Sequence, residues 1–346
     1  MKEFAKYLIN EQATVRDALI ALNALSDDIQ TLFVISESDE LKGTITDGDI
    51  RRGLIEGITI DDPVLRLMHT VFKYIKESDK DVAYIKQLKK SNIELLPCLD
   101  EKGRIIGIYN LKKLASILPV DAVMMAGGRG ERLRPLTEKT PKPLLPLGGK
   151  PIIDHNVDRL INYGVRNISV TVNYLGEQII DHFKSHQNGA NIHCIKEPEF
   201  LGTIGSVQFI DTFVNDTILV MNSDLFTNID YEEFYLHFLE NDADVSVAAI
   251  PYSISVPYGI FELEERNILG IKEKPVYNYY ANAGIYLIKK KLLKLIPKNT
   301  YCDATDFIEM LIANNHKVIR FPLIGYWIDI GKHEDYKKAQ EFIRHL

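Results

Sequence analysis

Residues 125–147 read MAGGRGERLRPLTEKTPKPLLPL, a segment in which glycines, prolines and basic residues alternate with short apolar runs. Such a segment is typical either of a surface turn or of a loop that holds a phosphate group, because glycines let backbone N–H groups approach an anion closely. The apolar run DAVMMA (121–126) directly before it has the length of a buried strand. A loop that follows a strand lies where open α/β sheets bind their ligands.

The residue types exclude two common phosphate-binding loops. A P-loop ends in Gly-Lys-Ser/Thr, and a dinucleotide-binding loop has a third glycine where its helix packs on the strand. Here Gly127, Gly128 and Gly130 are followed by Arg132, and Lys142 stands between two prolines. We therefore predict a triphosphate site, in which the glycine loop binds the nucleotide and Arg132 and Lys142 are the catalytic cations.

The chain after Pro119 alternates strand-like and helix-like segments. Strands are predicted at 121–126, 167–174, 192–197, 217–224, 244–252, 258–265, 283–289 and 318–323, and a helix at 151–164. This alternation predicts an α/β domain over residues 120–346, with a Rossmann-like, mainly parallel sheet covered by helices on both faces.

Residues 1–118 contain an internal repeat with a shift of 64 positions. DALIAL (17–22) aligns with DVAYIK (81–86), and LKGTITDGDI (41–50) aligns with IIGIYNLKKL (105–114). Each copy, about 1–60 and 61–118, predicts the order helix, strand, tight turn, strand, helix. The 346-residue chain is thus expected to form two domains, 1–118 and 120–346.

Composition excludes several classes of protein. The net charge of −7 argues against a nucleic-acid partner, and no apolar run reaches the length of about 18 residues typical of a membrane helix. Three scattered cysteines, without a signal-type N-terminus, indicate a cytoplasmic protein with no disulfide framework. His182 and His186 have helical spacing, but no third ligand accompanies them, so we interpret them as a solvated helix face.

Several motifs occur in the order used by the sugar-1-phosphate nucleotidyltransferases, whose sugar-nucleotide domain is GT-A-like. They are GGRGERLRPLT with PKP, LGTIGS (201–206), NSD (222–224), YGIFE (258–262), EKP (273–275), NAGIY (282–286) and WIDIG (327–331). Residues 120–346 resemble this family. The resemblance implies that Mg²⁺ is the cofactor and that Asp224 and Asp329 bind it. It places the nucleobase beside Leu201, Gly202 and Thr203, and the sugar phosphate beside Gly259, Glu273, Lys274 and Asn282.

Residues 1–118 resemble the paired CBS domain, a regulatory module that often binds adenosine nucleotides and associates into homo-oligomers. In that family a Gly-x-x-Thr-x-x-Asp segment contacts the nucleotide, and the first copy has Gly43, Thr46 and Asp49. The second copy departs from this pattern, with Lys113 at the position of the aspartate. Thr46 and Asp49 equally suit the start of a helix, where they would cap its first turn. The sequence leaves both interpretations open.

The resemblance is closest to guanylyltransferases that act on mannose-, heptose- or glucosamine-1-phosphate. A fused CBS pair is a feature of the glucosamine-1-phosphate guanylyltransferases of legionaminic acid biosynthesis. We therefore expect GTP and glucosamine-1-phosphate as substrates, with a uridylyl-, thymidylyl- or cytidylyltransferase as the alternative. A sensor that binds nucleotide sugars without turnover is the non-enzymatic alternative.

Overall fold

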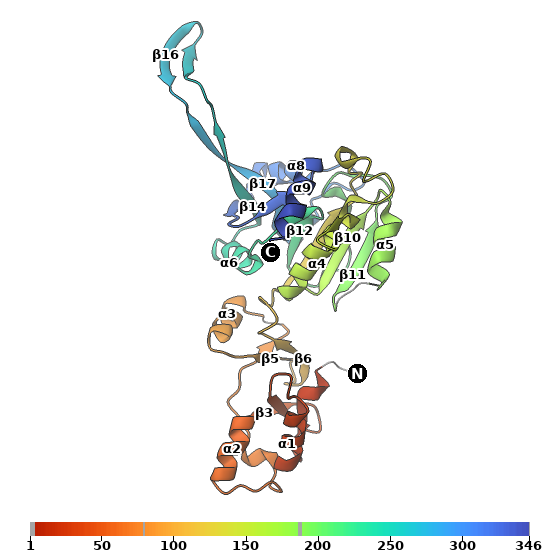
Figure 1. Cartoon of the computed structure of the whole chain (residues 1–346), viewed down its shortest axis with the longest axis vertical. Coiled ribbons are helices and arrows are strands. Elements are labelled where there is room, and N and C mark those ends of the chain that lie inside the picture. The colour runs from red at the N-terminus through yellow and green to blue at the C-terminus, as the bar shows by residue number, and fades with distance from the viewer. Residues whose placement is uncertain (1–3, 79, 186–188, 346) are drawn as a thin grey trace. The chain divides into compact units, whose positions relative to one another are not determined.

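The computed structural model describes residues 4–78, 80–185 and 189–345. The chain divides into two compact units, the first ending at Ile117 and the second beginning at Leu118 (Figure 1). The boundary lies next to Pro119, where the pattern of the sequence changes. Each unit has its own buried core and is described separately.

Unit 1 contains two halves with a similar order of elements. The first half consists of β1 (Leu8–Asn10), α1 (Val15–Asn23), β2 (Thr31–Ile35), β3 (Leu41–Thr46) and α2 (Asp47–Ile55). The second half consists of β4 (Ile75–Lys76), α3 (Val82–Lys90), β5 (Leu95–Leu99) and β6 (Ile105–Asn110). In each half the first strand pairs in parallel with the second, and the second pairs antiparallel with the third.

The predicted helix at the end of the second half is wrong. Over the described residues after β6 the chain forms a turn, in which Asn110 Oδ1 accepts hydrogen bonds from the backbone N–H groups of Lys112 (3.0 Å) and Lys113 (3.2 Å). A short polar side chain that bonds to the backbone in this way competes with helix formation. The first half has Thr46 at the matching position, and Thr46 instead begins α2.

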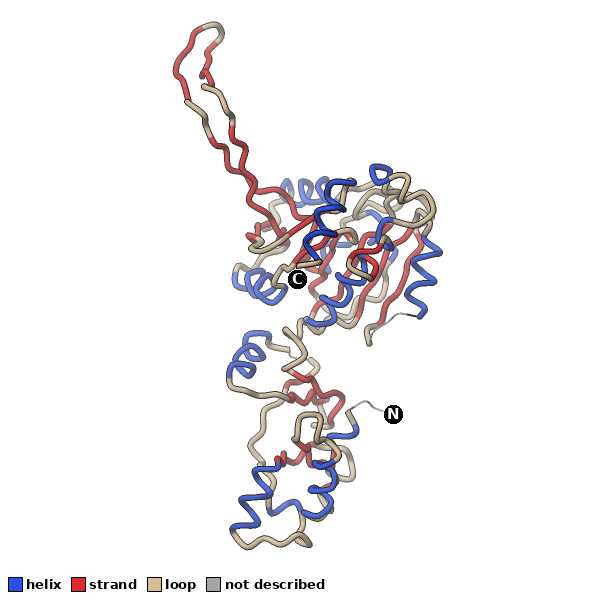
Figure 2. The backbone as a smooth tube through the Cα atoms, viewed as in Figure 1, coloured by secondary structure: helices blue, strands red, loops and turns tan. Residues whose placement is uncertain are grey.

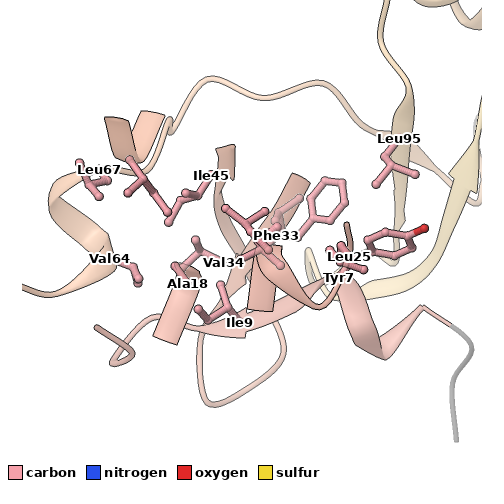
Figure 3. Close-up of a cluster of buried hydrophobic side chains, with 14 of the residues drawn as sticks. Tyr7, Ile9, Ala18, Leu25, Phe33, Val34, Ile45, Val64, Leu67 and Leu95 are labelled. Atoms are coloured by element: carbon pink, nitrogen blue, oxygen red, sulfur yellow. The ribbon is translucent and has the colours of Figure 1, made fainter. Parts of the chain in front are cut away.

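The core of unit 1 joins its two halves. Phe33, Val34 and Ile45 are buried among side chains from the first half, and Leu95 and Ile105 from the second half belong to the same cluster (Figure 3). Because apolar burial is the main favourable term in folding, this shared cluster explains why the two halves form one unit.

Unit 2 is built on a seven-stranded sheet of order β11-β10-β7-β12-β17-β14-β18, counted over the described residues. Its strands are β7 (Val120–Ala126), β10 (Asn167–Val172), β11 (Asn191–Lys196), β12 (Thr217–Asn222), β14 (Val245–Ser255), β17 (Val276–Lys289) and β18 (Val318–Pro322). Strand β17 is antiparallel to both of its neighbours, and the other pairs are parallel. The predicted α/β class with a mainly parallel sheet is confirmed.

Helices cover both faces of this sheet (Figure 1). They are α4 (Ile152–Asn162), α5 (Gly176–Ser185), α6 (Tyr231–Glu240), α7 (Lys290–Leu293), α8 (Ala304–Ala313) and α9 (His333–Ile343). Successive residues of β10 and β12 are buried, although neighbours in a strand point to opposite faces. The burial pattern therefore agrees with a sheet that is covered on both sides.

Two small sheets complete the body of unit 2. Strands β8 (Pro146–Leu147) and β9 (Lys150–Pro151) form a hairpin after the glycine loop. Strands β13 (Leu225–Thr227) and β19 (Trp327–Asp329) pair antiparallel, although about a hundred residues separate them. This second pairing joins two of the predicted motifs.

A long two-stranded ribbon extends from the sheet, and we call residues 250–281 the arm (Figures 1 and 2). Strands β14 and β17 continue their antiparallel pairing beyond the sheet, from Ile250 opposite Ala281 to Ser255 opposite Val276. The tip contains β15 (Ile260–Glu264) and β16 (Asn267–Lys272). The sequence predicted a strand at 258–265, but its alternation of apolar residues does not distinguish an arm from the body of a sheet.

Candidate active site

A cleft of 350 Å³ lies beside the carboxyl ends of β7 and β12. These strands are parallel neighbours, so the loops that follow them meet at one edge of the sheet. Its lining includes Gly127, Gly128, Gly130, Arg132, Lys142, Glu197, Phe200, Gly202, Thr203 and Asp224. The structure therefore brings the predicted phosphate loop, both catalytic cations, one predicted metal ligand and part of the predicted base site to one cleft.

The glycine loop is closed tightly onto the segment that carries Lys142. Gly130 has a φ of +61°, and a Cβ atom there would lie 3.0 Å from Thr137 Cγ2 and 3.2 Å from Lys142 Cβ. Thr137 Oγ1 donates a hydrogen bond of 2.8 Å to the carbonyl oxygen of Gly130. A larger residue at position 130 would be strained and would displace Lys142.

Lys142 joins the phosphate loop to the two aspartates. Its side chain is nearly buried, and its Nζ forms an ion pair with Asp224 and lies 4.0 Å from Asp329 Oδ1. The flanking prolines restrict the short helical turn Lys142–Leu144 that holds the lysine. A cation between two carboxylates offsets a charge repulsion that the fold would otherwise contain.

The pairing of β13 with β19 brings the two aspartates together. Asp224 directly precedes β13, Asp329 ends β19 opposite Leu225, and the backbone N–H of Ile330 donates to the carbonyl oxygen of Asp224 at 3.2 Å. Partial burial and the neighbouring carboxylate of Asp224 raise the pKa of Asp329 above its ordinary value.

This pair has the chemistry of a magnesium site. Asp224 Oδ1 is buried and, within the described residues, has no hydrogen-bond partner. Over all the residues that the structure describes, no group of three or more His, Cys, Asp or Glu side chains is arranged to hold a metal ion. Two carboxylates suit Mg²⁺, which usually takes its remaining ligands from phosphate oxygens and water. The residues present therefore fit this ion.

Arg132 faces the same side of the cleft as Asp329. A Cβ atom at Gly331 would lie 3.5 Å from a guanidinium nitrogen of Arg132 and 3.6 Å from Asp329 Oδ2. Among the described residues Arg132 forms no ion pair or side-chain hydrogen bond. Its donors are available to a phosphate group, which an arginine binds through two parallel hydrogen bonds.

The LGT motif forms a wall of the cleft against the start of α8. Gly202 has a φ of +81°, and a Cβ atom there would lie 2.6 Å from the carbonyl oxygen of Cys302. Thr203 Oγ1 accepts a hydrogen bond of 2.8 Å from Ala304 N. Leu201 is buried and does not line the cleft, so it packs behind the residues that do.

Glu197 is a residue of the cleft that the sequence interpretation missed. Its side chain is 4% exposed, and within the described residues its Oε2 has no hydrogen-bond partner. A Cβ atom at Gly127 would lie 2.6 Å from Glu197 Oε1, so only glycine leaves room for this carboxylate. Burial raises the pKa of Glu197. In the sequence, the signal that could have indicated Glu197 was its position: it is a charged residue at the end of the predicted strand 192–197, just before the LGT motif.

The predicted sugar-phosphate residues are not brought to the cleft. Gly259, Glu273 and Lys274 lie on the arm, and Asn282 lies at its base, where its Nδ2 donates to Tyr286 Oη at 2.8 Å. Gly259 faces Glu273, because a Cβ atom at Gly259 would lie 2.9 Å from Glu273 Oε2. Gly259, Glu273 and Lys274 therefore lie apart from the cleft. Asn282 lies at the root of the arm, where its Oδ1 accepts a hydrogen bond from Gly284 N at 2.9 Å.

Thr46 and Asp49 lie in unit 1 and have different surroundings. Thr46 lines a cleft of 440 Å³ together with Phe72 and Lys73, whereas Asp49 is buried and does not line it. Asp49 Oδ2 accepts hydrogen bonds from Thr46 N (2.8 Å) and Thr46 Oγ1 (2.6 Å), and Oδ1 contacts Arg52 and His69. The capping interpretation therefore describes Asp49 in this structure.

The interpretation of His182 as a solvated residue is wrong. Its Nε2 lies 2.7 Å from Asp154 Oδ1, and both side chains are largely buried between α5 and α4. His186 lies outside the described residues.

No helix within the described ranges is both long and apolar enough to cross a bilayer.

Two protein families match this chain. The nucleotidyl transferase family matches residues 121–345, and the CBS domain family matches residues 7–56. The bifunctional protein GlmU of Methanocaldococcus jannaschii is 35% identical over 232 residues, which are 65% of this chain and 54% of that protein. A putative mannose-1-phosphate guanyltransferase of Sulfolobus acidocaldarius is 30% identical over 63% of this chain and 62% of its own length.

The chain therefore spans about half to three fifths of these curated relatives. Among solved structures, HddC from Yersinia pseudotuberculosis complexed with GMP-PN is 27% identical, has a TM-score of 0.51 and matches over 65% of this chain and 99% of its own. The matched region contains the glycine loop, Lys142, Asp224 and Asp329. The chain thus belongs to the nucleotidyl transferase family and carries a CBS domain in its N-terminal unit.

Proposed function

We propose that this protein joins a nucleoside triphosphate to a sugar-1-phosphate and releases pyrophosphate. The observation that supports the proposal is the contact of Lys142 with Asp224 and its approach to Asp329. These contacts connect the glycine loop to two carboxylates that fit a metal ion. A sensor needs no metal ligands, whereas transfer at a phosphorus atom needs positioning and charge stabilisation.

Each group of residues in the cleft would have its own role in this reaction. Backbone N–H groups of the glycine loop and the guanidinium of Arg132 would bind the β- and γ-phosphates, which leave as pyrophosphate. Lys142, which contacts Asp224, would also bind the α-phosphate. Mg²⁺ bound by Asp224 and Asp329 would offset the charge of the assembled phosphates. A sugar phosphate is already an anion, so no side chain needs to act as the nucleophile.

We expect Asp224→Asn to lower turnover about a hundredfold or more, because it removes a metal ligand whose effect is several kcal/mol. Pyrophosphate release should be measured with Mg²⁺, each nucleoside triphosphate, and glucosamine-, mannose-, heptose- and glucose-1-phosphate. Glucosamine-1-phosphate is the sugar expected to react fastest. Asp216→Asn is the matched control, since this aspartate is 98% exposed. Release with no pair of substrates would refute the proposed reaction, and full activity of Asp224→Asn would refute the metal site.

We infer that the base is guanine, and Glu197 supports this inference. Guanine presents two adjacent donors, N1–H and N2–H₂, which bind the ionised carboxylate and so oppose the rise in the pKa of Glu197 that burial causes. Uracil and thymine present one N–H between two carbonyl oxygens, which a carboxylate repels. Glu197 is buried in the cleft with an unpartnered oxygen, so two donors from a base would compensate its burial. The guanyltransferase among the relatives agrees with this inference.

Glu197→Gln should lower kcat/KM for GTP by roughly ten- to a hundredfold, because a charged hydrogen bond of about 1.5–3 kcal/mol is replaced by an amide with one donor and one acceptor. The preference for GTP over UTP should fall by a similar factor. Glu199→Gln is the matched control, since Glu199 is an exposed residue of the same segment. An unchanged GTP/UTP ratio in Glu197→Gln would contradict guanine recognition by this residue.

Asp329→Asn should stabilise the metal-free protein while it lowers activity. Because the folded protein raises the pKa of Asp329, its ionised form is unfavourable, and the wild type loses stability as the pH rises from 3.8 through the raised value. The variant has no carboxylate to ionise at this position and does not lose stability in this way. Its melting temperature should therefore exceed that of the wild type by the full amount at pH 8 and by less as the pH falls towards 4. Melting should be followed in EDTA with Asp216→Asn as the control. An advantage that grows on acidification would contradict the repulsion between the aspartates.

For unit 1 we propose that an adenosine nucleotide binds in the cleft lined by Thr46, Phe72 and Lys73 and alters the activity of unit 2. Phe72 offers a ring for stacking, Lys73 an exposed cation for a phosphate, and Thr46 a hydroxyl that can accept a hydrogen bond from the ribose. Asp49 would act indirectly, by holding Thr46 at the start of α2.

Lys73→Ala should weaken binding of AMP, ADP or ATP about tenfold, because it removes one charge-assisted contact of about 1.5 kcal/mol. Titration calorimetry on the full chain measures this change directly. Lys76→Ala is the matched control, since Lys76 lies nearby on β4 and pairs with Glu101 outside the cleft. Equal affinities of wild type and Lys73→Ala would exclude this mode of binding, as would the absence of binding to the wild type.

A further inference from the structure

The arm exposes an unusual amount of apolar surface. Eleven large apolar or aromatic side chains between residues 252 and 280 are exposed. Examples are Ile254, Phe261, Leu263, Ile268, Leu269 and Ile271, each between 45% and 65% exposed. So many exposed apolar side chains on one segment indicate a surface that contacts another molecule.

The arm is a two-stranded ribbon without a third strand or a packed face, so we expect another protein surface to cover it. A two-stranded ribbon is marginally stable without a third strand or a packed face. The pairing of β14 with β17 is regular from Ile250 to Ser255, so the ribbon continues straight out of the sheet. Glu273 precedes Asn282 by nine residues in the sequence, and nine residues of extended chain span about 30 Å. Among the described residues, no residue of the arm lines the cleft of its own chain.

The arm carries the residues that the cleft lacks. Among the described residues, Arg132 and Lys142 are the cations that line the cleft, and Lys142 already contacts Asp224. Glu273 and Lys274 lie together on the arm, where the strands of the tip meet those of the base. Lys274 has a φ of +43°, a strained conformation for a lysine that is typically retained at functional positions.

We propose that the arm docks across the cleft of a second copy of this chain and supplies Glu273 and Lys274 to the partner's sugar-phosphate site. This proposal rests on the transferase function proposed above. Each copy has one arm and one cleft, so a two-fold exchange covers both apolar arms and completes both sites at once. The arm contains four acidic and three basic residues, so its small net charge does not oppose association.

Complementation between two inactive variants tests this exchange. Asp224→Asn has an intact arm and a defective cleft, whereas the double variant Glu273→Ala/Lys274→Ala has an intact cleft and a defective arm. The two proteins, carrying different affinity tags, are coexpressed, and mixed dimers are verified by native mass spectrometry. Lys272→Ala is the control for the arm, since Lys272 pairs with Glu262 and is expected to retain activity.

In a mixed dimer of the two variants, the intact arm of Asp224→Asn would reach the intact cleft of Glu273→Ala/Lys274→Ala, so one of the two sites would be complete. Random assembly at equal amounts should then restore about a quarter of the wild-type activity, and the purified mixed dimer about half. Each variant alone should remain inactive. Verified mixed dimers without restored activity would show that the arm serves its own cleft, and a monomeric active wild type would show the same; either result overturns the proposal.

Failure of the proposed reaction would be recognised separately, by a wild type that releases no pyrophosphate with any substrate pair. In that case sedimentation of the wild type and of Phe261→Asp/Ile271→Asp still tests docking of the arm. Both side chains are more than half exposed, so the change leaves the core of unit 2 intact. Loss of the dimer in the variant supports docking, and an unchanged mass overturns it.

Discussion

The ion pair between Lys142 and Asp224 is the interaction on which the arrangement of the cleft in unit 2 depends. It joins the loop after β7 to the segment after β12, and the pairing of β13 with β19 adds Asp329 to the same place. Two carboxylates held close together repel each other, and the nearly buried ammonium group offsets that repulsion. The phosphate-binding half of the cleft and its acidic half are therefore mutually dependent.

The cleft keeps several groups in states that are unfavourable for stability alone. Glu197 and Asp224 each have a buried oxygen without a partner among the described residues, and the pKa of Asp329 is raised. Buried polar atoms are normally paired, so such groups indicate places where a ligand completes the hydrogen bonding. These groups are the ones to which the proposed function assigns the metal ion and the nucleobase.

Unit 2 separates its functional residues between a compact body and an extended arm. The body holds the nucleotide half of the proposed site, whereas Glu273 and Lys274 lie on a ribbon with an exposed apolar surface. In the proposed exchange this division would couple assembly to catalysis, because the apolar arm that a second copy would cover also carries Glu273 and Lys274. Unit 1 has its own cleft, in which the proposed adenosine nucleotide would bind.

The sequence by itself determined the α/β class, the family, and several of the residues that line the cleft of unit 2. Apolar periodicity indicates buried strands, and Gly130 and Lys142 occupy positions that tolerate few other residue types. Only the tertiary structure decided that Leu201 lies behind the wall, that Asp49 caps its helix, that Glu197 faces the cleft and that the sugar-phosphate motifs lie on an arm. The physical reason is that motifs and periodicity are local, whereas burial, pairing of distant strands and the reach of a ribbon depend on contacts between residues far apart in the chain.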